Sequence, residues 1–317
     1  MLINLNRTEK YEKTFLALGT MNVISAYGKN SRQAVAAACE RVMEIHGRMS
    51  VYDKGSDVAR INENSGLGAQ EIHLDTFSLL KRSLEFSELS GGAFDITIRP
   101  LTELWGFGKK QNYMPSKHEI ERALHLVNYR DLLLDVENCT AYLVKAGQSI
   151  DLGGIAKGYA ADEVKRILLQ HQISDALINL GGNIVAMGHR EDGLPWRIGV
   201  QNPLSARGEY IGTFEASDKT IVTSGSNEQF FIRDGVRYHH IIDPRTGYPA
   251  DSDLLSVTVI CSSSTDADAL TTSIFVSGIS DSMNLLKSAD AQAIFVMNNK
   301  DLFLTEALRN TFKRSYS

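Results

Sequence analysis

The sequence predicts an α+β fold in which mostly antiparallel sheets are flanked by helices, and three observations support this class. Short runs of β-branched and aromatic residues end at glycine turns, which is typical of hairpins. Several longer segments carry apolar residues at helical spacing. These segments follow each other without the regular strand–helix–strand rhythm of a parallel sheet, so antiparallel pairing is favoured.

Composition sets the size and the class of the protein. The 317 residues suffice to bury a core without disulfide or metal crosslinks. Hydrophobic residues account for 43% and charged residues for 22%, which excludes a disordered, collagen-like or coiled-coil chain. No fixed repeat or obvious linker divides the chain. We therefore expect residues 1–317 to form a single compact unit, with a two-lobed arrangement as the alternative.

The net charge, the cysteines and the hydropathy indicate which partners and which cellular location to expect for this protein. The formal net charge of −5 argues against a nucleic-acid binder, which normally shows a basic excess. Cys39, Cys139 and Cys261 are widely spaced, and each is expected to be a small buried side chain rather than half of a disulfide. The sequence shows no secretory signal, lipid-anchoring cysteine or membrane-length apolar run, so a cytoplasmic protein is predicted.

Hairpin and helix signals alternate along the chain. Residues 15–28 predict two short strands around Gly19, and residues 176–188 predict a tight hairpin around Gly181 and Gly182. A strand pair is expected over residues 141–152. Further strands are expected over residues 196–203, 209–216, 220–226 and 291–298. The predicted helices are residues 31–49 with Ser31 as N-cap, 75–89 before Gly91 and Gly92, 117–126, 155–170, and 265–276 before Gly278.

A glycine turn before a predicted helix is the first candidate site. In residues 150–162, IDLGGIAKGYAAD, a strand is expected to end at Asp151 and a helix to begin near Ala156. Backbone N–H groups at a helix start attract anions, and Lys157 adds a full positive charge. The alternative is a tight turn that needs glycine only for backbone reasons.

A carboxylate and a hydroxyl one helical turn apart form the second candidate site. If a helix starts at Thr265, Asp268 and Thr272 lie on the same face. Both supply hard oxygen ligands, which suit Mg²⁺ with water and phosphate completing its coordination. The alternative is that Thr265 and Asp268 form a capping box at the start of the helix.

Two adjacent histidines form the third candidate site. Asp234-Gly235 predicts one turn, and a second turn is expected at residues 243–247. His239 and His240 lie between these turns at a strand end, where alternation points them to opposite faces. In one interpretation, one histidine bonds the backbone as a structural residue and the other faces a cleft as a proton carrier or phosphate partner. The alternative is that they are ordinary core or surface histidines.

A segment rich in glycine and aromatic residues is the fourth candidate site. Residues 91–108, GGAFDITIRPLTELWGFG, offer Phe94, Trp105 and Phe107 for stacking on a flat ligand. Ordinary hydrophobic packing explains these aromatic residues equally well.

Together these segments resemble the ApbE family of FAD:protein FMN transferases. The resemblance covers roughly residues 15–300 and rests on blocks that occur in one order. The blocks are LGT, MSVYD, GGAFDITIRPLTELWGFG, IDLGGIAKGYAAD, LINLGGNI, SGSNEQFF, HHIIDPRTGYP and DADALTTSIFV.

The resemblance implies an activity and a set of site residues. FMN passes from FAD to a Thr or Ser hydroxyl of a flavoprotein that carries a D-x-x-[ST]-G-A-[ST]-like motif, and AMP leaves. The implied ligands of Mg²⁺ are Asp268, Thr272, the carbonyl oxygen of Ala156 and the main-chain oxygen of Thr271. The implied FAD-binding residues are Leu18, Gly19, Tyr52, Ala93, Phe94, Asp95, Asp151, Lys157 and His240. The implied catalytic residues are His240, Asp151 and Lys157.

Two other activities are weighed against this one. A Mg²⁺-dependent pyrophosphatase would use the same site to hydrolyse FAD to FMN and AMP. A non-enzymatic FAD-binding or storage protein would need no metal site, so the metal-ligating pattern argues against it. No nucleic acid and no membrane anchor are expected as partners.

Overall fold

The computed structural model describes residues 9–110, 112–206 and 208–315. Residues 1–8, over which the sequence predicts no secretory signal, lie outside the described residues. Every strand pair among the described residues is antiparallel, which confirms the predicted α+β class. Cys39, Cys139 and Cys261 are free thiols, as expected, but only Cys39 and Cys261 are buried, whereas Cys139 is half-buried.

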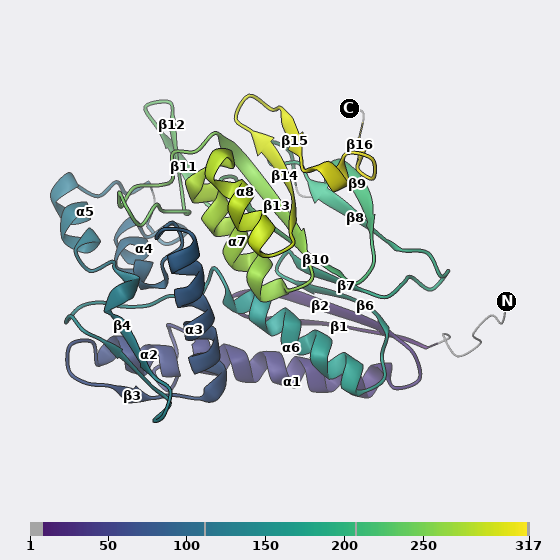
Figure 1. Cartoon of the computed structure of the whole chain (residues 1–317), viewed down its shortest axis with the longest axis horizontal. Helices are drawn as coiled ribbons and strands as arrows, with labels where there is room; N and C mark the ends of the chain where they lie inside the picture. Colours follow the sequence, from purple (N-terminus) through teal and green to yellow (C-terminus); the bar gives the residue numbers. More distant parts are fainter. Residues whose placement is uncertain (1–8, 111, 207, 316–317) are drawn as a thin grey trace.

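A large antiparallel sheet is the centre of the fold (Figure 1). Its strands lie in the order β1-β2-β6-β7-β10-β13-β14-β15. Their bounds are β1 Lys10–Ala17, β2 Thr20–Tyr27, β6 Asp175–Leu180, β7 Asn183–Met187, β10 Lys219–Gly225, β13 Leu254–Cys261, β14 Gln292–Met297 and β15 Leu302–Leu304.

Two of the predicted hairpins lie side by side in this sheet. Leu18 and Gly19 join β1 to β2 with φ angles of 53° and 70°, the left-handed conformation that tight hairpin turns require. Gly181 and Gly182 join β6 to β7 in the same way. A β-carbon at Gly181 would overlap the side chain of Thr20, because β2 pairs with β6 and brings the two turns together. Both hairpin predictions are confirmed.

Helices cover one face of the large sheet. Figure 1 shows α1, α6 and α7 across this face, and their contacts place α6 between α1 and α7. The helix bounds are α1 Ser31–Met49, α2 Asp57–Glu63, α3 Leu74–Leu89, α4 Arg99–Trp105, α5 Lys117–Leu124, α6 Ala156–Gln170, α7 Ser264–Ser277 and α8 Ile279–Ser288. The main hydrophobic core lies between these helices and the sheet.

Three smaller sheets complete the fold. The sheet β16-β9-β8 forms a second core against the other face of the large sheet. A third apolar cluster joins α4 and α5 to the β11–β12 hairpin. The bounds are β3 Gln70–Glu71, β4 Leu132–Asp135, β5 Thr140–Leu143, β8 Trp196–Gln201, β9 Tyr210–Ala216, β11 Phe230–Arg233, β12 Val236–His239 and β16 Lys313–Arg314.

The structure corrects two local predictions. Ser31 is the first helical residue of α1 rather than its cap, and Asn30 occupies the N-cap position. The strand pair expected over residues 141–152 is also wrong, since only β5 forms there and it pairs with β4. The backbone N–H and C=O of Ile150 bond instead to the amide side chain of Asn62, at 2.7 and 3.0 Å. Side-chain bonds thus replace a strand ladder just before Asp151.

Candidate active site

A cavity of about 1240 Å³ brings most of the predicted site residues together. One wall comes from residues 93–98 and a second from the start of α6 and the facing side of α7. Strands β8 and β9 form a third wall, and the end of β10 with the residues after β12 forms the last. Each wall comes from a different part of the chain, so the cavity exists only in the folded protein.

The start of α6 and the middle of α7 hold a carboxylate and an ammonium group close together. The Gly158 backbone N–H donates to Asp268 Oδ2 at 2.9 Å, so a carboxylate occupies the electropositive helix start predicted from the sequence. Lys157 Nζ lies 3.6 Å from Asp268 Oδ1 and donates to the Gly153 carbonyl oxygen at 2.8 Å. Lys157 and Asp268 both line the cavity.

The N-terminus of α7 is anchored by a residue of α6 rather than by the predicted capping box. Ser263 is the N-cap and accepts from the Asp266 N–H. Asp162 accepts from the Thr265 N–H at 2.8 Å and from the Thr265 hydroxyl at 2.7 Å. Thr265 is therefore not a cap, and Asp268 remains available to the cavity.

The donor groups at this point fit a magnesium ion. Asp268 and Thr272 line the cavity one turn apart on α7, as the sequence predicts. No cluster of three or more His, Cys, Asp or Glu suited to a metal occurs in the part of the chain that the structure describes. A metal here would rely on one carboxylate together with hydroxyl, backbone and substrate oxygens, which is a donor set that Mg²⁺ accepts.

The other two predicted ligands lie beside the cavity wall. Ala156 is the first residue of α6 and is buried. Thr271 is buried in α7, and its hydroxyl donates to the Asp268 carbonyl oxygen at 2.8 Å. The Ser224 hydroxyl in turn donates to Thr271 Oγ1 at 2.9 Å. The Thr271 side chain thus steadies the Asp268 backbone.

Asp151 lies at the cavity wall in the glycine turn before α6. Its Oδ1 accepts from the Gly153 N–H at 2.8 Å, and its Oδ2 lies 3.9 Å from Arg99 Nη1. The side chain is partly exposed. A carboxylate with one oxygen held and the other facing solvent and a guanidinium can orient a polar group of a ligand.

An exposed tyrosine marks another part of the cavity. The Tyr52 side chain is 70% exposed and lines the cavity together with Leu18, Ala93 and Phe94. Lys109 Nζ lies 4.3 Å from the Tyr52 ring centroid and donates to its hydroxyl at 2.8 Å. An exposed aromatic ring beside small and apolar residues offers a stacking surface for a flat ligand.

Asp95 also lines the cavity, but its carboxylate bonds to the protein. Asp95 Oδ1 accepts from the Thr97 N–H and hydroxyl at 2.8 and 2.6 Å, and Oδ2 accepts from the Tyr129 N–H at 2.9 Å. Burial raises the pKa of Asp95 despite these bonds. The residue therefore shapes the loop that forms this wall. Gly19, in the turn beside Leu18, is not among the lining residues.

Two of the aromatic residues predicted as stacking candidates belong to a core. Trp105 is 1% exposed, and its indole N–H donates to the Gly247 carbonyl oxygen at 2.8 Å. Phe107 stacks on Trp105 with ring centroids 5.6 Å apart. Neither lines the cavity, so the packing explanation holds for both, and only Phe94 reaches the site.

The two histidines diverge as predicted. His239 is buried, its Nε2 lies 3.1 Å from the Ala250 carbonyl oxygen, and burial lowers its pKa to about 4. His240 lines the cavity. Its buried Nδ1 has no hydrogen-bond partner among the described residues. Burial also lowers the pKa of His240, against the opposing effect of Glu228, so the ring is neutral at pH 7. A neutral imidazole with a free nitrogen can take up a proton.

Sequence reasoning missed part of the cavity. Asn183 and Ser256 line it, and each has a buried polar atom without a partner among the described residues. Such atoms are costly unless a ligand or water satisfies them, which marks this wall as a polar contact surface. Asn183 lies within the LINLGGNI block, the one signal that could have found it. Strands β8 and β9 add Arg197 and Tyr210, which no local motif marks.

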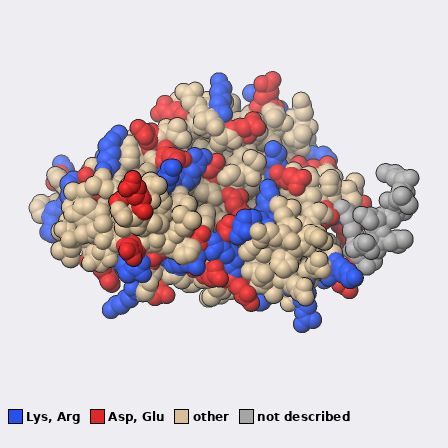
Figure 2. All heavy atoms as spheres, turned by 60° about the horizontal axis from the view of Figure 1, so that its bottom comes forward, with Lys and Arg blue, Asp and Glu red and all other residues tan. Residues whose placement is uncertain are grey.

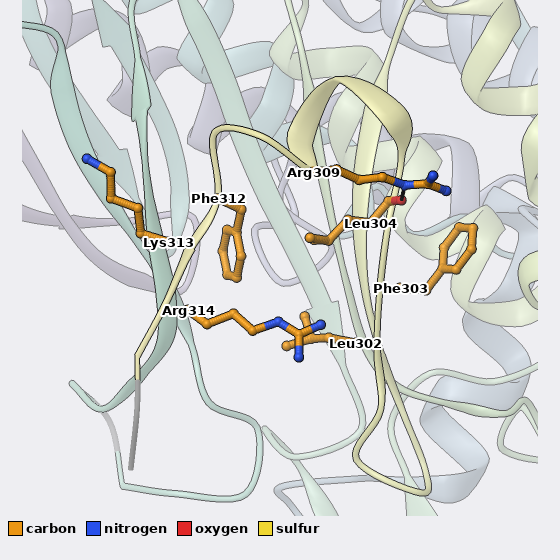
Figure 3. A pocket seen from close by; sticks show the side chains of 7 residues that line it. All are labelled: Leu302, Phe303, Leu304, Arg309, Phe312, Lys313 and Arg314. Carbon is orange, nitrogen blue, oxygen red and sulfur yellow. Dashed lines mark hydrogen bonds between the residues drawn. The ribbon is translucent and has the colours of Figure 1, made fainter.

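A second, smaller hollow lacks comparable chemistry. Its volume is about 670 Å³, and it lies beside the C-terminal strands (Figure 3). Its lining residues are Leu302, Phe303, Leu304, Arg309, Phe312, Lys313 and Arg314. It offers cations and apolar surface but no acid or histidine, whereas the large cavity holds the predicted carboxylates, Lys157 and His240.

Figure 2 shows basic and acidic side chains interspersed on one face of the molecule. None of the helices in residues 9–110, 112–206 and 208–315 combines the length and the apolar character needed to span a bilayer.

The fold and the cavity define an α+β protein with a large cavity, lined by a lysine, a histidine and carboxylates, that can hold a sizeable ligand. The ApbE family model matches residues 18–295, and the chain belongs to this family. It is 35% identical over 312 residues to a Treponema pallidum protein named FAD:protein FMN transferase, covering 93% of this chain and 86% of that protein. It is 34% identical over 307 residues to a protein of the same name from Klebsiella pneumoniae, covering 95% and 94% of the two chains.

Solved structures agree with this assignment. An ApbE protein from Thermotoga maritima matches with a TM-score of 0.87 and 35% identity, over 97% of this chain and 100% of that protein. The flavin transferase ApbE from Vibrio cholerae matches with a TM-score of 0.86 and 27% identity, over 96% and 99% of the two chains. The predicted ApbE-like fold is thereby confirmed.

Proposed function

We propose that this chain is an FAD:protein FMN transferase. The observation that carries the proposal is the cavity in which Lys157, Asp268, Thr272 and His240 come together. The names of the relatives in the same family support it. A site with a metal-ligating pair and a free imidazole is more than FAD storage requires.

The proposed reaction breaks the phosphoanhydride bond of FAD and forms a phosphoester bond to the acceptor protein. The hydroxyl oxygen of a Thr or Ser on the acceptor protein forms a bond to the phosphorus of the FMN half of FAD. The bond from that phosphorus to the oxygen bridging the two phosphates breaks, and AMP leaves with the bridging oxygen. The hydroxyl proton passes to a base, so the products are FMN esterified to the acceptor and AMP.

The residues that line the cavity have different roles in this proposed reaction. His240, neutral and unpartnered at Nδ1, orients the phosphate or accepts the hydroxyl proton. Lys157 places a positive charge beside the pyrophosphate, and Asp151 orients a polar group of the ligand or assists the hydroxyl. At the polar wall, the Asn183 side-chain amide donates a hydrogen bond to FAD, and the Ser256 hydroxyl offers a second hydrogen-bonding group. Tyr52, Leu18, Ala93 and Phe94 hold the flat flavin ring.

The proposal includes a magnesium ion and its ligands. Asp268 and Thr272, with the main-chain oxygens of Ala156 and Thr271, would hold the ion against the pyrophosphate. Bound there, Mg²⁺ would neutralise the negative charge that builds on the leaving AMP. The acceptor motif and the cytoplasmic location remain predictions from the sequence.

The direct test uses the full chain with FAD, Mg²⁺ and a purified domain that carries the D-x-x-[ST]-G-A-[ST] motif. Intact mass is read on the domain, and AMP is followed in the same sample. We expect a gain equal to FMN minus water that disappears when the metal is chelated. AMP release with free FMN and no mass gain would assign a pyrophosphatase instead. Bound FAD with neither product would assign a storage protein.

A further inference from the structure

Two sets of hydrogen bonds join α6 to α7, one helical turn apart. In the first set, the Gly158 N–H donates to Asp268 Oδ2 at 2.9 Å. In the second set, Asp162 accepts from the Ser264 N–H at 2.9 Å and from the Thr265 N–H at 2.8 Å. Gly158 and Asp162 share a face of α6, and Ser264 and Asp268 share a face of α7, because each pair is four residues apart. The two helices are therefore fastened at two successive turns.

Asp162 uses both carboxylate oxygens to hold the start of α7. Oδ1 accepts from the Ser264 N–H, and Oδ2 accepts from the Thr265 N–H and, at 2.7 Å, from the Thr265 hydroxyl. The first N–H groups of a helix have no partner within the helix and attract negative charge, so a carboxylate binds them well. Neither Asp162 nor Thr265 lines the cavity. Asp162 thus acts on α7 and does not contact a ligand in the cavity.

The backbones of the two helices touch at the same place. A β-carbon at Gly158 would lie 2.2 Å from the Ser264 carbonyl oxygen, so only glycine allows this approach. The contact sets how close α6 and α7 can come, and the bonds to Asp162 keep them from moving apart. The spacing of the two helices is therefore fixed from both sides.

The proposed magnesium ligands come from both of these helices. Ala156 begins α6, whereas Asp268, Thr271 and Thr272 belong to α7. Mg²⁺ requires a nearly ideal octahedron with oxygens at about 2.0–2.1 Å, whereas Ca²⁺ accepts about six to eight oxygens at about 2.3–2.6 Å in flexible arrangements. A change in the spacing of α6 and α7 should therefore disturb the binding of Mg²⁺ more than that of Ca²⁺.

We propose that Asp162 is a positioning residue that fixes the spacing of α6 and α7 and thereby makes the metal site selective for Mg²⁺ over Ca²⁺. It acts through Asp268, because it fastens α7 one turn before that ligand. The proposal rests on the proposed function, to which the metal site belongs.

Two variants loosen the bonds at the start of α7. Asp162→Asn keeps the size of the side chain but removes its charge and turns an NH₂ group toward a backbone N–H that now donates to a carboxylate oxygen. Thr265→Val keeps the carboxylate and both backbone bonds and removes only the hydroxyl bond. This milder variant decides the question if Asp162→Asn does not fold.

Asp57→Asn is the matched control. Asp57 is 6% exposed and holds the start of a different helix, α3. Its Oδ2 accepts from the His73 N–H at 3.0 Å and from the Thr76 hydroxyl at 2.7 Å. Asp57, His73 and Thr76 do not line the cavity. The control therefore removes bonds of the same kind away from the proposed metal site.

The measurement is equilibrium binding of each metal ion. MgCl₂ and CaCl₂ are titrated separately into each FAD-loaded, full-length protein in a calorimeter, and thermal unfolding is followed without metal. Residues that hold metal ligands in place commonly change metal affinity by about 10–100-fold, so we expect Asp162→Asn to weaken Mg²⁺ binding about tenfold. Ca²⁺ binding should weaken less than about twofold, because Ca²⁺ tolerates a looser site.

The other two variants should differ in kind. Thr265→Val loses one bond of the set, so it should weaken Mg²⁺ binding about threefold and leave Ca²⁺ binding nearly unchanged. Asp57→Asn should lower the unfolding temperature and leave the affinity for both ions as in the wild type, because the bonds that it removes hold α3.

The outcomes separate this proposal from the proposed function. Unchanged Mg²⁺ affinity in each folded variant of Asp162 and Thr265 overturns the positioning role. An equal loss for Mg²⁺ and Ca²⁺, or a similar loss in Asp57→Asn, also overturns it, because a general loss of stability would then be the cause. A wild type that binds no Mg²⁺ overturns the proposed metal site together with this role. The expected change in selectivity, with no flavin transfer by the wild type to the acceptor domain, supports the role of Asp162 and overturns the transferase.

Discussion

The α6–α7 pair and the β11–β12 hairpin border the same cavity but are built in opposite ways. Between the two helices, Gly158 bonds Asp268, and Asp162 holds the N-terminus of α7. Gly158 also lies so close to Ser264 that a β-carbon would overlap the carbonyl oxygen of that residue. The hairpin, by contrast, leaves Phe230 and Ile232 exposed. The difference teaches that the fold packs tightly where it holds the ionic groups of the site, which makes the helix pair the rigid end, and leaves apolar side chains of the hairpin uncovered.

Removing the carboxylate of the rigid end should have the largest effect. In Asp268→Asn the shape and the bond from Gly158 are kept, while the negative charge that would hold the proposed metal is lost. We expect Mg²⁺-dependent transfer to fall about a thousandfold, a loss of about 4 kcal/mol of transition-state stabilisation. FAD affinity, measured by flavin fluorescence, should change much less. Full activity of this variant would overturn the metal assignment.

Substitution of His240, the cavity residue at the end of the hairpin, should have the next largest effect on transfer. We expect His240→Ala to lower the rate of transfer about a hundredfold and to weaken FAD binding far less. In the wild type, burial lowers the pKa of His240, so transfer should persist below pH 6.5. The rate should then fall as protonation removes the free nitrogen, and that acid limb should vanish in the variant. An equal fall in rate and in FAD affinity would make His240 a binding residue only.

A substitution that disturbs the packing of α6 against α7 should have the smallest of these effects, a loss of stability. Gly158→Ala forces a β-carbon against the Ser264 carbonyl, and we expect a loss of about 1–3 kcal/mol in the free energy of unfolding. The matched control is Gly47→Ala in α1, because a β-carbon at that position meets nothing within 4 Å. Alanine there should stabilise the helix by about 0.5–1 kcal/mol. Urea unfolding measures both, and stabilisation in both would contradict the close packing of α6 and α7.

Local patterns in the sequence predicted much of the rigid end. The i, i+4 spacing predicted that Asp268 and Thr272 share a face, and strand alternation predicted that His239 and His240 diverge. The capping box at Thr265 failed because a carboxylate of another helix, Asp162, bonds this residue instead. The stacking role of Trp105 failed because the α4–α5 cluster buries the ring.

The sequence by itself determined the α+β class, the two hairpins, most helices and, through its ordered motifs, the family. These features depend on local conformation and spacing, which neighbouring residues set. Only the tertiary structure decided which carboxylate meets the start of α6 and that β8 and β9 wall the cavity. These are contacts between segments far apart in the chain, and the packing of distant surfaces creates them.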